Sequence, residues 1–186
     1  MKETQMKTSL WKRTGIKLWA IGILWSLMSC GNHQTTSDQD INPDSLKKDL
    51  MDVNEFMVKN ENQQIENYIA RHQWKMEKTG TGLRYSIYEK GNGPKAEKGK
   101  VVQIRFTASL ITGDVVYDAK TDGMRSVKLG KAQVVSGLEE GLLMMQEGDK
   151  AKLIIPSHLA FGLVGDDNKI PKRATLIYDI ELVKVL

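Results

Sequence analysis

The stretch that decides the fold reads Val101-Val102-Gln103-Ile104-Arg105-Phe106-Thr107-Ala108-Ser109-Leu110. Apolar and polar side chains alternate along it, which is the period-two pattern of a β-strand with one buried face. Its apolar face carries Val102, Ile104, Phe106, Ala108 and Leu110. Thr112-Gly113-Asp114 then supplies a hairpin turn into Val115-Val116-Tyr117. The sequence therefore predicts an antiparallel pair of strands between residues 101 and 117.

Further strands are predicted on both sides of this hairpin. Residues 83–89 alternate weakly between apolar and polar side chains. In residues 150–155 Ala151, Leu153 and Ile155 alternate with Lys150 and Lys152, and in residues 176–183 Leu176, Tyr178, Ile180 and Leu182 alternate with Ile177, Asp179, Glu181 and Val183. Between them, residues 134–145 place Leu138, Leu142 and Met145 at helical spacing. These patterns predict an α+β domain of roughly a hundred residues, in which an antiparallel sheet packs on one short helix.

A helical segment precedes this domain. Asn42 and Pro43 form a helix start, with Asn42 as N-cap and Pro43 at the first helical position. Apolar side chains then recur at helical spacing as Leu46, Leu50, Val53, Met57, Ile65, Tyr68 and Ile69. Residues 43–76 are therefore expected to form one long or two short amphipathic helices. Their apolar stripe can cover the following domain or pair with a second copy of the chain, and the sequence leaves both open.

The first thirty residues carry a targeting signal. Residues 2–17 hold scattered cations, and residues 18–28 form an uncharged apolar run of about eleven residues. Such a run is too short to span a bilayer, which takes about twenty residues, but it suits a secretory signal. Leu27-Met28-Ser29-Cys30-Gly31 resembles a bacterial lipobox, in which the Cys is acylated and the preceding peptide is removed. Cys30 is the chain's single Cys, which excludes an internal disulfide.

The charge of the chain is concentrated in that signal. The whole chain has 27 Lys and Arg against 23 Asp and Glu, and residues 1–29 hold five of these cations and one of these acids. The mature chain from Cys30 onward is therefore formally neutral. Binding to the phosphates of nucleic acid requires a localised basic surplus, so we exclude a nucleic-acid partner.

Metal and nucleophilic chemistry find no support in the sequence. His33, His72 and His158 lack the spacing of metal ligands, and neither Ser136 nor Ser157 lies in a nucleophile elbow. Glu139-Glu140 are adjacent helical residues that do not face each other, so a solvated helix face explains them. We expect no metal and no cofactor.

The order and spacing of several runs resemble the FKBP-type peptidyl-prolyl cis-trans isomerases, in a bacterial lipoprotein form like that of Bacteroidetes. The matching runs are Val101–Thr107, Val116-Tyr117-Asp118, Leu129-Gly130, Gln133–Gly141, Gly148–Leu153, Leu159-Ala160-Phe161-Gly162, Ile170-Pro171 and Ala174–Leu182. This resemblance implies an antiparallel half-barrel sheet wrapped on one short helix, with an apolar pocket between them.

The resemblance also implies the residues of that pocket. Its catalytic positions would be Tyr117, Asp118, Val135 and Phe161, and its substrate-binding positions Phe106, Val134, Leu138, Ile170 and Tyr178. Leu138 would form the floor, and the Val135 N–H would bind the substrate carbonyl. Phe161 stands where relatives often have Tyr, and Arg125 where they often have an aromatic residue.

The implied activity is peptidyl-prolyl isomerisation without a cofactor. Planarity of the X–Pro amide opposes rotation by about 18–20 kcal/mol. A water-poor pocket that fits the twisted amide would lower this barrier by differential binding. The alternative is a non-catalytic FKBP-fold chaperone or assembly subunit of an envelope machine.

The sequence thus predicts four parts: a lipoprotein signal at 1–29, a polar tether at 30–42, a helical segment at 43–78 and an isomerase domain at 79–186. The expected location is the cell envelope, with a lipid on Cys30 in the outer membrane and the domain facing the periplasm. The expected partners are proline-containing exported polypeptides and the membrane, and residues 43–76 are the candidate homodimer contact.

Overall fold

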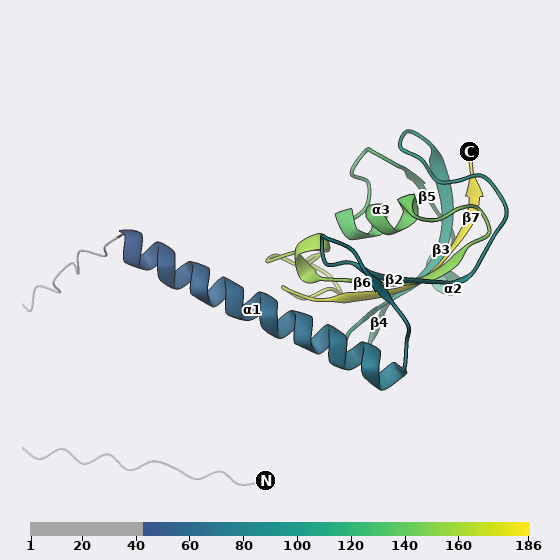
Figure 1. Cartoon of the computed structure of the whole chain (residues 1–186). Helices are drawn as coiled ribbons and strands as arrows, with labels where there is room; N and C mark the ends of the chain where they lie inside the picture. Colours follow the sequence, from purple (N-terminus) through teal and green to yellow (C-terminus); the bar gives the residue numbers. More distant parts are fainter. Residues whose placement is uncertain (1–42) are drawn as a thin grey trace, which may run out of the picture. The chain divides into compact units, whose positions relative to one another are not determined.

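The computed structural model describes residues 43–186, shown in Figure 1. The lipobox with Cys30, the signal at 1–29 and the tether at 30–42 lie outside the described residues. The described elements, in chain order, are α1 (Pro43–His72), β1 (Glu77–Lys78), β2 (Arg84–Glu89), β3 (Val101–Leu110), β4 (Val115–Asp118), α2 (Ala119–Asp122), β5 (Arg125–Lys128), α3 (Ser136–Leu143), β6 (Lys150–Ile155), the 3-10 helix η1 (Ser157–Leu159) and β7 (Leu176–Val185).

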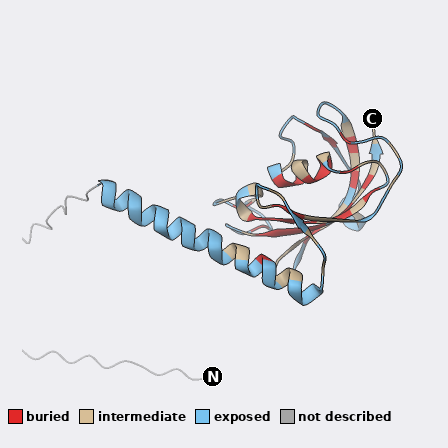
Figure 2. Ribbon diagram, viewed as in Figure 1, coloured by how far each residue is buried: buried red, intermediate tan, exposed pale blue. Residues whose placement is uncertain are grey.

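The strands form one antiparallel sheet that wraps around α3. The strand order is β1-β2-β6-β7-β3-β4. β4 pairs with the C-terminal half of β3, and β5 pairs with its N-terminal residues 101–104. The predicted hairpin of β3 and β4 is confirmed, and the Gly113 N–H donates to the Leu110 carbonyl in its turn. The concave face of the sheet and α3 enclose the main hydrophobic core (Figure 2). The predicted α+β fold, with one short helix against an antiparallel sheet, is thereby confirmed.

The alternation along β3 gives the expected burial. Val102, Ile104 and Ala108 are fully buried, whereas Arg105 is exposed. Two close approaches hold α3 against β6, because a side chain at Gly137 or Gly141 would collide with Ile155 or Leu153. Small residues at these two positions therefore let the helix lie directly on the sheet.

The segment before the domain is one continuous helix, α1, rather than two. It ends at His72, four residues before the expected end at residue 76. The Trp74 N–H bonds the Ile69 carbonyl and the Gln73 N–H bonds the Ala70 carbonyl. With Gln73 at a φ of 54°, these bonds form a Schellman motif that stops the helix. Glu77 and Lys78, expected in the helical segment, instead pair with β2 as a short strand.

Only the C-terminal part of α1 is docked on the sheet. Ile65 is fully buried against Ile154 and Ile177, on the face of the sheet opposite to α3. The buried Arg84 side chain donates to Glu66 at 2.8 Å and to Asn62 at 2.9 Å, both of which lie on α1. Residues 43–60 of α1 are exposed throughout (Figure 2). The helix is thus anchored at one end and solvated over the other.

Within residues 43–186, no helix has both the length and the apolar character needed to cross a bilayer.

Candidate active site

The floor and back wall of the predicted pocket are built by α3, β3 and β7. Leu138 on α3 is 2% exposed, and Tyr178 on β7 is 5% exposed. The Phe106 ring lies 5.3 Å from the Tyr178 ring, centroid to centroid, at an angle of 41°. The strands therefore bring two aromatic rings together next to the helix.

The remaining apolar residues of the predicted pocket join the same hydrophobic cluster. Leu138, Ile170 and Tyr178 are buried members of the main core, and the partly buried residues packed against it include Phe106, Tyr117, Val134, Val135 and Phe161. All eight apolar residues are thus brought together from β3, β4, β7, α3 and the two loops that flank η1 and α3. Their roles toward a substrate stay predictions.

Asp118 lies at the edge of this cluster and is held by short-range hydrogen bonds. Its carboxylate accepts from the Lys120 N–H at 2.9 Å and from the Thr107 hydroxyl at 3.4 Å. The first bond makes Asp118 the N-cap of α2, a single helical turn. Both bonds go to the same carboxylate oxygen, Oδ1, and the role of Asp118 toward a substrate stays a prediction.

Val135 presents a backbone donor at the start of α3. It is the N-cap residue of that helix, with φ −60° and ψ 146°, and its carbonyl accepts from the N–H groups of Leu138 and Glu139. No acceptor for the Val135 N–H occurs among residues 43–186. An unpaired N–H beside a half-buried apolar cluster is a donor available to a substrate carbonyl.

A hydrogen bond between Tyr117 and Asp166 closes the loop after η1 over the pocket. The Tyr117 hydroxyl donates to the Asp166 carboxylate at 2.5 Å, and the Lys169 ammonium lies 5.0 Å from the centre of the Tyr117 ring. The other Asp166 oxygen accepts from the N–H groups of Asn168 and Ile170. One carboxylate therefore links β4 to the loop that carries Ile170.

The electrostatics of this group follow from these bonds. The hydrogen bond to Asp166, with partial burial, raises the pKa of Tyr117. Desolvation alone would raise the pKa of Asp166, but the bonds from Tyr117 and the backbone N–H groups outweigh it and lower that pKa. Burial raises the pKa of Tyr178 to about 12, against a lowering influence of Arg125. The hydroxyls of Tyr117 and Tyr178 are therefore protonated at neutral pH.

Arg125 occupies one rim of the pocket. It pairs with the buried Ile104 across β5 and β3, so its side chain starts from the inner face of the sheet. The guanidinium donates to the Gln133 carbonyl at 3.1 Å, next to Val134. A cation thus stands beside the pocket where an apolar wall would otherwise be.

Two acids on α3 differ from their expected role as a solvated helix face. Glu139 accepts from the Gly130 N–H at 2.9 Å, and Glu140 accepts from the Thr81 hydroxyl at 2.8 Å. Both are half-buried and tie α3 to neighbouring loops. In the described part of the chain, no three or more His, Cys, Asp or Glu side chains are grouped so that they could hold a metal.

Comparison with known proteins identifies this arrangement. The model of the FKBP-type peptidyl-prolyl cis-trans isomerase domain matches residues 93–183. An FK506-binding protein of Neisseria meningitidis serogroup B is 39% identical over 106 residues, which are 56% of this chain and 96% of that protein. The chain belongs to the FKBP-type peptidyl-prolyl cis-trans isomerases.

Longer relatives of this isomerase family also match. A probable FKBP-type isomerase, FkpA, of Neisseria meningitidis serogroup B is 36% identical over 107 residues, which are 58% of this chain and 39% of that protein. The crystal structure of FkpA from Escherichia coli has a TM-score of 0.60 and 30% identity, and the match covers 81% of this chain and 74% of that one. The second match extends beyond the isomerase domain.

Sequence reasoning missed Asp166, Lys169 and Glu61, which support the pocket from outside the motif runs. Asp166 follows a glycine, Gly165, at a φ of 80° in a loop, a position that gives no periodic signal. Glu61 interrupts the apolar stripe of α1 between Met57 and Ile65, and its partners become apparent only in three dimensions. Contacts of this kind between distant segments cannot be found from local patterns.

Proposed function

We propose that this FKBP-type isomerase is a lipoprotein of the bacterial envelope that catalyses cis-trans isomerisation of X–Pro bonds in exported polypeptides. The observation that supports the catalytic part is that the eight apolar residues expected in the pocket all belong to the main hydrophobic core, and that Val135, one of them, has a backbone N–H with no acceptor among residues 43–186. The observation that carries the location is the lipobox ending at Cys30.

The pocket can lower the rotation barrier without any covalent step. Amide resonance places charge on the carbonyl oxygen and the nitrogen, and water stabilises this planar form. A proline ring seated on Leu138, beside the Phe106 and Tyr178 rings, loses that water and favours the less polar, twisted amide. The Val135 N–H donates to the carbonyl of the substrate's X–Pro amide and holds it in the rotated position. The pocket therefore binds the twisted amide more strongly than the planar one. Asp118 keeps the rim of the pocket in place.

The Val135 N–H can be removed with little other change. Its φ of −60° is the value that proline requires, so Val135→Pro deletes the donor without forcing the backbone at this residue. We expect kcat/KM for an X–Pro peptide to fall about tenfold, the scale of one lost hydrogen bond. Val135→Ala is the matched control, since it trims the side chain and keeps the N–H. Equal activity in wild type and Val135→Pro would remove Val135 from the mechanism.

Two wall positions favour a second candidate function, a non-catalytic chaperone or assembly subunit. Phe161 lacks a hydroxyl, and Arg125 places a charge at the rim. The chaperone function predicts that the protein suppresses aggregation of an unfolded chain while its proline-limited refolding rate stays at the uncatalysed value. Replacing Asp118 by Leu separates the two functions, because the isomerase loses activity and a passive binding surface does not.

Membrane attachment is proposed from the signal sequence. Acylation of Cys30 with two or three chains would anchor the protein stably, whereas one chain would not. We expect the protein in the outer-membrane fraction, facing the periplasm, and Cys30→Ser in the soluble fraction. A wild-type protein recovered without lipid would contradict this part. The Bacteroidetes-like form of the lipoprotein stays a prediction.

A homodimer through α1 is proposed from its uncovered apolar side chains. Leu46, Leu50, Val53 and Phe56 are 46%, 61%, 53% and 68% exposed. Pairing with a second copy would cover this stripe and leave both isomerase pockets free. Sedimentation of Leu50→Glu against wild type checks this. A monomeric wild type, or a variant that sediments as the wild type does, would contradict it.

A further inference from the structure

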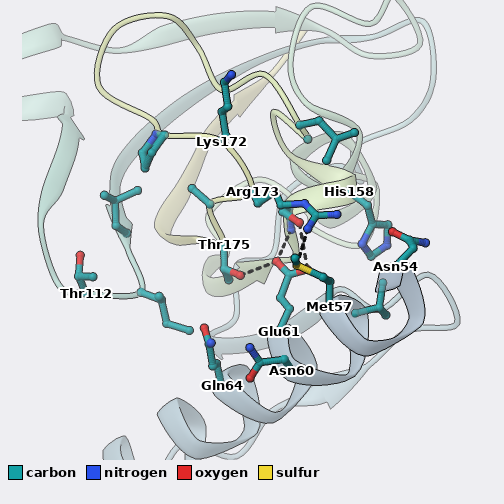
Figure 3. Close-up of a pocket in the computed structure, with 18 residues that line it drawn as sticks. Asn54, Met57, Asn60, Glu61, Gln64, Thr112, His158, Lys172, Arg173 and Thr175 are labelled. Carbon is teal, nitrogen blue, oxygen red and sulfur yellow. Dashed lines mark hydrogen bonds between the residues drawn. The ribbon is translucent and has the colours of Figure 1, made fainter. Parts of the chain in front are cut away.

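Glu61 of α1 forms hydrogen bonds with both ends of the segment that supplies one wall of the predicted substrate pocket. Figure 3, which shows the neighbouring cavity beside α1, includes the bond from Thr175 to Glu61. Its Oε1 accepts from the Ser157 N–H at 2.7 Å and from the Thr175 hydroxyl at 2.7 Å. Its Oε2 accepts from the Ser157 hydroxyl at 3.0 Å. One carboxylate on the helix thus accepts three hydrogen bonds from two residues, Ser157 and Thr175, that lie 18 positions apart in the sequence.

The segment between these donors carries two residues of the pocket. Ser157 begins η1 and Thr175 immediately precedes β7. Phe161 and Ile170, which line the predicted pocket, lie between them. Apart from the three residues of η1, this segment contains no helix or strand. Apart from the bond between Asp166 and Tyr117, its ends are therefore the places where its position can be set.

Packing against the helix does not fix this segment by itself. A cavity of about 470 Å³ lies between α1 and the loop, and its lining includes Met57, Leu163 and Pro171. Leu163 is 67% exposed. On the α1 side this space leaves the loop room to shift, and on the core side the shift is opposed by the burial of Ile170. The hydrogen bonds to Glu61 oppose this shift at the ends of the segment, while the bond from Tyr117 to Asp166 opposes it in the middle.

The helix position does not depend on the loop. Ile65, one turn after Glu61 on the same face of α1, is fully buried against Ile154 and Ile177. Arg84, whose side chain is 2% exposed, binds Glu66 of α1 at 2.8 Å. These contacts lie on strands that do not move with the loop, so Glu61 is a fixed point for it.

We propose that Glu61 is a positioning residue of the isomerase, through which α1 holds the wall formed by Phe161 and Ile170 at the pocket. This inference rests on the proposed isomerase function. It makes α1 part of the working enzyme rather than only a spacer or a dimer contact. It also means that the domain cut at residue 79 has a looser pocket than the full chain.

The test compares three variants of the full-length protein in mild detergent. Glu61→Ala removes all three hydrogen bonds, and we expect KM for an X–Pro peptide to rise about tenfold with kcat changed less than threefold. Glu61→Gln keeps one carbonyl oxygen for the Ser157 N–H and the Thr175 hydroxyl, so it should restore KM to within threefold of wild type. Glu55→Ala is the control, because Glu55 lies on the same helix and its ion pair is with Lys59, away from the loop. It should leave KM unchanged.

A second measurement does not require catalysis. Hydrogen exchange of the amides in 157–175 should be faster in Glu61→Ala than in wild type, with β3 unchanged in both. The proposal is overturned if Glu61→Ala keeps the wild-type KM and exchange, or if exchange rises equally throughout the domain. A wild type without isomerase activity would defeat the proposed function, and the exchange measurement would still decide whether Glu61 positions the loop.

Discussion

Replacing Ile65 by Ala removes the main apolar contact between α1 and the sheet. Ile65 is fully buried, and its neighbours Ile154 and Ile177 belong to rigid strands that cannot move in to fill the space. Such substitutions cost about 2–5 kcal/mol, and more where the site cannot collapse. Tyr68 and Trp74 at the edge of this cluster permit some repacking. We therefore expect a loss of about 3 kcal/mol in the free energy of unfolding.

The assay is thermal and urea unfolding of the full-length variant against wild type. For a chain of this size each kcal/mol shifts Tm by about 2–4 °C, so Ile65→Ala should melt about 6–12 °C lower. Met51→Ala is the matched control on the same helix, since Met51 is 62% exposed, lies outside the stripe proposed for the dimer, and its loss should change stability by less than about 0.5 kcal/mol. An unchanged Tm for Ile65→Ala, or an equal shift in both variants, would refute the docking of α1 through this residue.

Three further predictions concern the pocket and its support. Tyr117→Phe removes the donor to Asp166, and peptide affinity should weaken by about 1–2 kcal/mol, somewhat less than a fully buried charged hydrogen bond because the group is partly exposed; an unchanged KM would contradict this. The folded pKa of Asp166 is lowered, so its contribution to stability is complete above the unfolded pKa near 4 and is lost as pH falls through the lower folded value. Tm measured from pH 6 to pH 2.5 should therefore fall less in Asp166→Asn than in wild type, and parallel curves would argue against it. Gly137→Ala would place its Cβ against Ile155 and should cost about 1–3 kcal/mol by overpacking, whereas an unaltered urea midpoint would show that α3 can move away.

The strands could be predicted because their burial alternates along the chain. In β3 the side chains of Val102, Ile104 and Ala108 face the core and Arg105 faces solvent. The local alternation of apolar and polar residues is therefore enough to predict both the strand and its buried face. The eight apolar pocket residues were predicted through motif resemblance. The structure gathers them because the pairing of β3 with β7 and β4 places Phe106, Tyr117 and Tyr178 on one face.

The docking of α1 could not be predicted from its own pattern. Leu50 and Ile65 occur in the same kind of helical stripe, yet one is exposed and the other buried, because burial depends on where the sheet lies. The available signal was in the sheet itself. The predicted strand 150–155 alternates only as far as Leu153, and its end, Leu153-Ile154-Ile155, is a continuous apolar run of the kind typical of a strand covered on both faces.

The polar supports of the pocket were missed for a different reason. Asp166 bonds Tyr117 across 49 residues, and Glu61 bonds Thr175 across 114. No local rule relates such positions, since each side chain reads as an ordinary solvated acid in the sequence. The one-turn helix α2 was missed because four residues show no periodicity, although Asp118 and Gly123 are suitable capping residues at its two ends.

The central claim is that this pocket accelerates rotation about X–Pro bonds. Its most direct test is the slow, proline-limited phase in the refolding of an unrelated protein, measured with increasing amounts of the full-length chain. The rate of that phase should rise in proportion to the concentration of the chain, and Val135→Pro should lower the slope about tenfold. A slow phase that keeps its uncatalysed rate at equimolar wild-type chain would contradict the claim.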